Sequence, residues 1–154
     1  MTDPASDPPS GDDYDLMPYR SMPYALSRPE HLAAVLRVFG IAAPDPEGAR
    51  VLELGCASGG NLIPLAARFP QARFLGIDLS RRQVADGQAR IADLGLNNIE
   101  IRQGDIALYD PGEARFDYVI CHGVYSWIPP DAQDGVMRIA DRALSPTGAA
   151  YVSY

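Results

Sequence analysis

The sequence contains no lysine, so all 13 of its basic residues are arginine. Without lysine, a protein has neither the amine used in Schiff-base catalysis nor the phosphate-binding lysine of the Walker motif. Its only two cysteines, Cys56 and Cys121, lie far apart and form no CxxC pattern. This spacing suggests neither a disulfide framework nor a zinc site, and we expect no bound metal.

Long apolar runs and basic patches are also missing. No stretch approaches the roughly 20 apolar residues of a membrane span, and no charged-then-apolar leader opens the chain. The net charge is −7, and five aspartates precede Arg20, the first basic residue. No basic patch is present that could neutralise phosphates. We therefore expect a cytoplasmic protein with no nucleic-acid or membrane partner; the sequence makes no prediction of its oligomeric state.

Composition divides the chain into three regions. Residues 1–13 are rich in Pro, Asp and Ser, which predicts a disordered acidic tail. Residues 14–49 combine an aromatic segment, in which Met-Pro-Tyr occurs twice, with a cap helix. The aromatic segment either packs on the outside of the domain or covers a ligand pocket as a lid. Residues 50–154 have the length and apolar content of a packed domain.

Strand and helix patterns alternate along the chain. Ser27 and Glu30 predict a capping box for a helix that ends before Gly40, with Leu32, Val35, Leu36 and Phe39 on one apolar face. Strands are expected near 51–54, 73–77, 99–102, 116–121 and 148–154, and helices near 60–69, from the Ser80–Gln83 capping box to Gly95, and at 131–144.

These strands are nearly continuous apolar runs, which is typical of a parallel sheet covered on both faces. We therefore predict an α/β fold with a doubly wound Rossmann-like sheet, strand order 3-2-1-4-5, and helices on both faces. Ligands are expected at the carboxyl ends of the strands.

The stretch Val51–Asn61, VLELGCASGGN, predicts a buried strand, a tight turn and the N-terminus of a helix that can meet a ligand. Residues 55–60 nearly match the dinucleotide pattern G-x-G-x-x-G. Ala57, however, occupies the position of the middle glycine, which lets the backbone approach a pyrophosphate. This substitution counts against NAD or FAD.

Three carboxylates lie at the ends of three successive strands: Glu53 and Asp78 end the first two, and Asp105 follows the third. Together they would repel a pyrophosphate, but they suit a ligand with an ammonium, a sulfonium, ribose hydroxyls and an adenine amino group. S-adenosylmethionine carries all four groups. We expect Asp78 to accept the ribose hydroxyls, Asp105 the adenine amino group, and Glu53 to orient the loop or reach the ammonium. The alternatives are a helix cap for Asp78 and a turn for Asp105.

The ordered motifs ELGCASGG, GIDLS, GDI and FDYVICHGV resemble those of class I S-adenosylmethionine-dependent methyltransferases over about residues 50–154. The segments YDLMPYRSMPY, GGNLIP and HGVYSWIPP are similar to bacterial members that carry a separate methyltransferase regulatory domain after the catalytic one. The resemblance implies methyl transfer by in-line displacement. It also implies that residues 50–154 are an incomplete domain lacking strands 6 and 7, within a fragment of a longer protein.

The residues that the resemblance and the charge pattern assign to the cofactor are Glu53, Gly55, Cys56, Ala57, Gly59, Asn61, Asp78, Leu79, Asp105, Ile106, His122 and Gly123.

His122, Tyr125 and Trp127 are candidates for the pocket of the methyl acceptor. His122 is either a general base or a packing residue, and the two aromatic residues either face a cationic amine or cover the following helix. The acceptor is a protein amine or a small molecule. Two other functions stay open: S-adenosylmethionine binding without turnover, and an NAD-type dehydrogenase.

Overall fold

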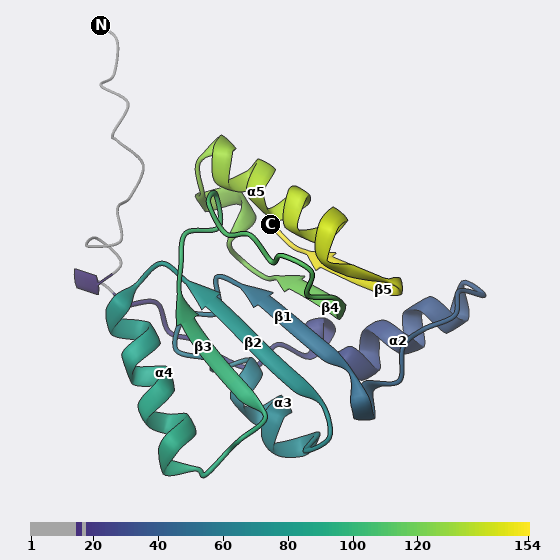
Figure 1. Cartoon of the computed structure of the whole chain (residues 1–154), viewed down its shortest axis with the longest axis horizontal. Coiled ribbons are helices and arrows are strands. Elements are labelled where there is room, and N and C mark those ends of the chain that lie inside the picture. The colour runs from purple at the N-terminus through teal and green to yellow at the C-terminus, as the bar shows by residue number, and fades with distance from the viewer. Residues whose placement is uncertain (1–14, 17) are drawn as a thin grey trace, which may run out of the picture.

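The protein is built on a parallel five-stranded sheet with the order β3-β2-β1-β4-β5 (Figure 1). A computed structural model describes residues 15–16 and 18–154, so the predicted tail at residues 1–13 lies outside the described residues. The observed order confirms the predicted doubly wound topology. The strands are β1 (Arg50–Leu54), β2 (Arg73–Asp78), β3 (Ile99–Gln103), β4 (Phe116–Cys121) and β5 (Leu144–Val152).

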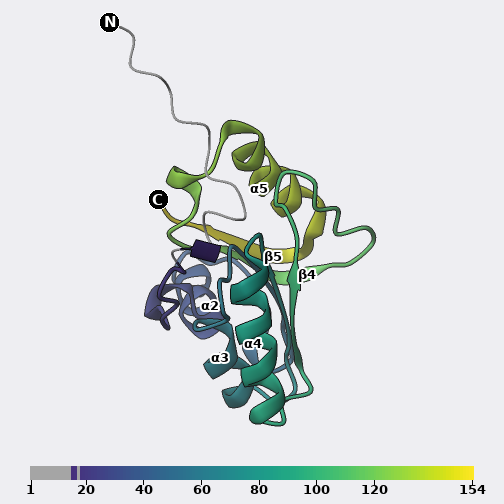
Figure 2. The same cartoon turned by 90° about the vertical axis from the view of Figure 1, so that its left-hand side faces the viewer.

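Helices cover both faces of the sheet, as predicted. Figure 2 shows α2, α3 and α4 on one side and α5 on the other. Across the described part of the chain, no helix has the length and apolar character needed to cross a membrane. The helical elements are α2 (Pro29–Val38), α3 (Leu62–Arg68), α4 (Arg81–Asp93), α5 (Pro130–Ala143) and the short 3₁₀ turns η1 (Ala25–Ser27), η2 (Pro46–Gly48) and η3 (Tyr125–Trp127).

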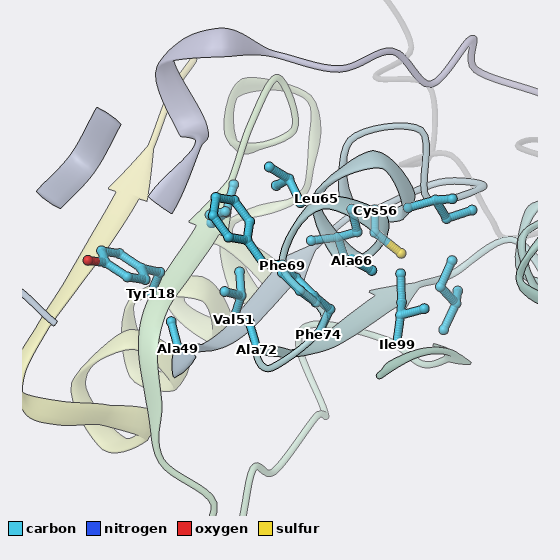
Figure 3. Close-up of a cluster of buried hydrophobic side chains, with 14 of the residues drawn as sticks. Ala49, Val51, Cys56, Leu65, Ala66, Phe69, Ala72, Phe74, Ile99 and Tyr118 are labelled. Carbon is cyan, nitrogen blue, oxygen red and sulfur yellow. The ribbon is translucent and has the colours of Figure 1, made fainter. Parts of the chain in front are cut away.

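The core forms two layers because successive strand residues point to opposite faces of the sheet. Val51 of β1 belongs to the layer beneath α3, with Phe74 and Tyr118 (Figure 3). Its neighbour Leu52 belongs to the layer beneath α5, together with Val136. Both faces of β1 are therefore buried, which explains why Val51, Leu52 and Leu54 are all apolar.

The start of α2 differs from the prediction, and the capping box at Ser27 and Glu30 is wrong. The helix begins after Arg28, which has no side-chain cap, and Ser27 Oγ donates to the Tyr24 carbonyl oxygen at 3.1 Å. The predicted apolar face is only partly covered, since Phe39 is 76% exposed. Helical spacing shows which residues share a face, but it does not show whether another element packs against that face.

The last strand also begins earlier than predicted. β5 starts at Leu144, immediately after α5 ends, and Leu144 pairs with Phe116 before a register shift. The chain therefore enters the sheet directly from α5, and residues 145–147, which the prediction left between helix and strand, belong to β5.

Of the capping box predicted for α4, the serine cap is confirmed and can be tested, whereas Ser80 N donates to Asp78 Oδ1 and not to Gln83. Ser80 Oγ accepts a hydrogen bond from Gln83 N at 3.1 Å and donates to Asp15. Because alanine cannot accept this bond, we expect Ser80→Ala to lower the free energy of unfolding by about 1 kcal/mol in urea titrations. Ser126→Ala, at an exposed position in η3, is the control and should have no effect. Equal midpoints for the two variants would contradict the capping role.

Candidate functional site

The loop between β1 and α3 has an unusual backbone. Gly55, Ala57 and Gly59 have φ angles of 72°, 50° and 74°. A Cβ atom at Gly55 would lie 2.5 Å from Val124 Cγ2, so this position requires glycine for space as well as for conformation. Ala57 is a non-glycine residue in the left-handed region, where such residues often belong to functional sites.

Asp78 holds this loop against the end of β2. Its Oδ2 accepts from Ala57 N at 2.7 Å, and its Oδ1 accepts from Ser80 N at 2.9 Å. Burial raises the pKa of Asp78, whereas the two backbone hydrogen bonds act in the opposite direction. Each carboxylate oxygen has a further lone pair, so Asp78 can still accept hydroxyl donors from a ligand.

Glu53 is a buried acid with one unpartnered oxygen. The residue is 4% exposed, and its Oε1 accepts from Asn61 Nδ2 at 2.9 Å. Its Oε2 has no hydrogen-bond partner among the described residues. Burial raises the pKa of Glu53 to about 8. At neutral pH the ligand-free group is therefore mainly protonated, and a cationic donor placed at Oε2 would supply the missing partner and favour the ionised form.

Residues 18–28, which we call the N-terminal strap, are hydrogen-bonded to the same loop. Ser21 Oγ accepts from Gly60 N at 2.8 Å, and Tyr24 N donates to Asn61 Oδ1 at 3.0 Å. Asn61 also donates to Ser27 Oγ at 3.1 Å, so its amide joins the strap to Glu53. The sequence left open whether the aromatic segment packs on the outside of the domain or covers a ligand pocket as a lid, and it gave no sign of these hydrogen bonds.

Asp105 and Ile106 lie beyond β3 in a turn. Asp105 is exposed, and its Oδ1 accepts from Ala107 N at 2.8 Å, which is the turn role that the sequence left open. Ile106 is buried against the α5 layer. Leu79, after β2, is half-buried. The structure thus places these residues at the carboxyl ends of the strands, while their contact with adenine stays a prediction.

His122 and Gly123 follow β4, and His122 contacts the N-terminal strap. His122 Nδ1 lies 2.7 Å from Ser153 Oγ, and the His122 ring stacks on Tyr24 with centroids 3.7 Å apart and planes 12° apart. Burial lowers the pKa of His122, which favours the neutral imidazole. The other two residues predicted for the acceptor pocket have different environments: Tyr125 packs against the core layer beneath α5, whereas Trp127 is 76% exposed.

The two thiols do not supply a nucleophile or a metal ligand. Cys56 and Cys121 are buried, and burial raises the pKa of both thiols. Within residues 15–16 and 18–154, no group of three or more His, Cys, Asp or Glu side chains could hold a metal ion.

A hollow of about 580 Å³ lies at the opposite ends of the strands, away from this site. Two of its arginines are already engaged: Arg102 pairs with Glu100, and Arg50 lies over the Phe116 ring at 5.5 Å. Since it contains none of the residues of the glycine loop, this hollow is separate from the site described above.

Comparisons with known proteins show the family of the chain. The family described as "Methyltransferase domain" matches residues 51–148. The chain is 47% identical to an uncharacterized protein from Rickettsia prowazekii, over 92% of this chain and 26% of that protein. It is 33% identical to a trans-aconitate 2-methyltransferase from Methylobacterium nodulans, over 88% of this chain and 47% of that enzyme.

Among solved structures, PKMT2 from Rickettsia typhi in complex with AdoHcy matches with a TM-score of 0.85 and 37% identity. The match covers 89% of this chain and 26% of PKMT2. The chain therefore spans about a quarter to a half of the length of these relatives. It belongs to the methyltransferase domain family.

Proposed function

We propose that this member of the methyltransferase domain family binds S-adenosylmethionine at the carboxyl ends of β1–β3 and directs its methyl group to an amine. The observation that carries the proposal is the buried Oε2 of Glu53, which has no partner among the described residues. It lies beside a glycine loop fixed by a second acid, Asp78. Two acids so placed favour a cationic ligand and disfavour the pyrophosphate of NAD.

The residues present fit the chemistry of this cofactor. Glu53 Oε2 would accept from its ammonium group, Asp78 would accept from the ribose hydroxyls, and Asp105 and Ile106 would flank the adenine. When bound, S-adenosylmethionine supplies a methyl group on a sulfonium that is already a good leaving group. The protein then has to orient the acceptor and exclude water, and positioning of this kind can contribute up to roughly 7–11 kcal/mol.

The acceptor side favours an amine over a carboxylate. Residues 121–129 and 151–154, which include the last residues of β4 and β5 and the segments after them, contain no arginine, and the chain has no lysine. Tyr24, His122 and Tyr151 lie there with ring centroids 3.7–6.5 Å apart. Aromatic faces attract cations, whereas a carboxylate acceptor requires cationic partners. Both a protein amine and a small-molecule amine fit this surface.

Cofactor binding is tested by calorimetry with S-adenosylmethionine. We expect Asp78→Ala to weaken affinity by about tenfold, because about 1.5 kcal/mol of hydrogen bonding to the ribose is lost. Thermal unfolding checks that the variant keeps its fold, since Ala57 N also loses its partner. Glu100→Ala, on the exposed side of β3, is the matched control and should bind normally. Unchanged affinity in Asp78→Ala would refute the assignment, as would tighter binding of NAD.

Turnover is tested separately with radiolabelled S-adenosylmethionine and two small probes, n-butylamine and trans-aconitate. The proposal expects S-adenosylhomocysteine and labelled product with the amine only. Product with trans-aconitate would overturn the amine assignment. Binding without product from either probe or from a lysine-containing peptide would overturn the proposed transfer and leave a cofactor-binding domain.

A further inference from the structure

Three segments that are far apart in the sequence meet around His122. His122 follows β4, Ser153 follows β5, and Tyr24 belongs to the N-terminal strap. Ser153 Oγ lies 2.7 Å from His122 Nδ1 and accepts from Gly123 N at 3.2 Å. Tyr24 stacks on the imidazole at 3.7 Å. The hydrogen bond fixes the rotation of the ring and the stack fixes its plane.

The hydroxyl of Ser153 determines which ring nitrogen is basic. A serine hydroxyl has two lone pairs and one hydrogen. Gly123 N occupies one lone pair. The second lone pair can accept from His122 Nδ1–H, across the 2.7 Å contact, and this tautomer leaves Nε2 unprotonated.

We propose that Ser153 and Tyr24 are positioning residues that present His122 Nε2 as the proton acceptor for the methyl-accepting amine. This inference rests on the proposed function. The N–H bond of the acceptor ammonium breaks, its electron pair stays on nitrogen as the nucleophile, and the proton binds Nε2. The resulting imidazolium keeps its Nδ1–H bond to Ser153 Oγ and later releases the proton from Nε2 to water.

The surroundings of His122 suit this role. A base that is oriented by a third group is the usual arrangement for proton transfer in active sites. Nε2 makes no hydrogen bond with the described residues, and the ring is only partly buried. The titratable groups that face the imidazole are the phenols of Tyr24, from the strap, and Tyr151, from β5. Burial raises the pKa of Tyr151 and lowers the pKa of His122, and both shifts favour the neutral forms of the two rings.

The tautomer can be measured on the protein itself, without an acceptor. Long-range ¹H–¹⁵N correlation spectra should show His122 protonated at Nδ1 at neutral pH. The sequence has one other histidine, His31, which serves as the internal reference. In Ser153→Ala the His122 signals should shift toward the Nε2–H form, while Ser153→Thr, which keeps the hydroxyl, should restore the wild-type pattern. A wild-type His122 protonated at Nε2 would overturn the proposal.

Kinetics provide the second readout, with n-butylamine as the probe. Ser153→Ala should lower kcat by roughly tenfold and shift the pH profile, while calorimetric affinity for S-adenosylhomocysteine stays unchanged. Ser126→Ala is the control and should leave both unchanged. An unaltered kcat and pH profile in Ser153→Ala would overturn the proposal. Failure of the wild-type protein to bind S-adenosylmethionine would instead refute the proposed function, and the tautomer measurement would still decide the state of His122.

Discussion

Replacing Asn98 with leucine is expected to lower the free energy of unfolding by about 3 kcal/mol. Asn98 precedes β3 and is 5% exposed. Its Nδ2 lies 3.0 Å, 3.0 Å and 3.2 Å from the carbonyl oxygens of Ala66, Phe69 and Ala72. Leucine has a similar size but no donor, so the carbonyl oxygens of Ala66 and Ala72 would lose this bond, whereas that of Phe69 would keep Ala72 N as a donor. Each buried carbonyl group left unpaired costs about 1–3 kcal/mol.

Urea unfolding followed by circular dichroism measures this loss, and the melting temperature should fall by roughly 6–12 °C. The neighbouring residue supplies a matched control: Asn97 is exposed, and Asn97→Leu should change stability by less than about 0.5 kcal/mol. If the two variants unfolded at the same urea concentration, the three-carbonyl contact would not stabilise the fold.

The sheet could be predicted from the sequence because burial on both faces leaves a strong local signal. β4 was predicted with its observed bounds, and β2 and β3 within one residue. The sequence pattern failed to predict side-chain hydrogen bonds to residues that are distant in the sequence. Ser27 has the right spacing to cap α2, but its hydroxyl instead bonds Tyr24 and Asn61. Asn98 carried no signal at all, because its three partners lie 26–32 residues away.

Only the position of part of the candidate site could be predicted from the sequence. Acids at strand ends can be found from a sequence, because the carboxyl ends of parallel strands meet at one edge. Asn61 was included only as a cofactor residue, whereas the structure makes it the joint between Glu53 and the N-terminal strap. Ser153 was missed altogether. It lies 31 residues from His122, and only the parallel pairing of β4 with β5 brings the two together.

Glu53 is expected to make the stability of the ligand-free protein depend on pH. Its folded-state pKa of about 8 lies above the ordinary value of 4.5. The folded protein therefore keeps a proton that the unfolded chain releases. The resulting stabilisation is complete below pH 4.5 and is lost as the pH rises through about 8. The change is of the order of a few kcal/mol.

Urea titrations between pH 5 and pH 9 test this. Glu53→Gln keeps an acceptor for Asn61 but cannot ionise, so its stability should vary much less over that range. Glu100→Gln is the control: Arg102 lowers the pKa of Glu100, which therefore titrates below the tested range. If Glu53→Gln and the wild-type protein lost stability in parallel, Glu53 would not be the titrating group.

The same carboxyl should couple cofactor binding to proton release. The ammonium of S-adenosylmethionine would favour the ionised form of Glu53, because Oε2 has no other partner among the described residues. The affinity for S-adenosylmethionine should therefore rise by nearly tenfold per pH unit between pH 6 and pH 7.5. This range lies below the pKa of an α-amino group, roughly 7.7–8.0, so the cofactor keeps its ammonium charge throughout. Calorimetry in two buffers of different ionisation enthalpy should detect about one proton released per cofactor bound.

Glu53→Gln should bind S-adenosylmethionine tenfold to a hundredfold more weakly, since a charged hydrogen bond contributes about 1.5–3 kcal/mol, and its affinity should not change with pH. Tight, pH-independent binding by both proteins would show that the cofactor does not use this oxygen.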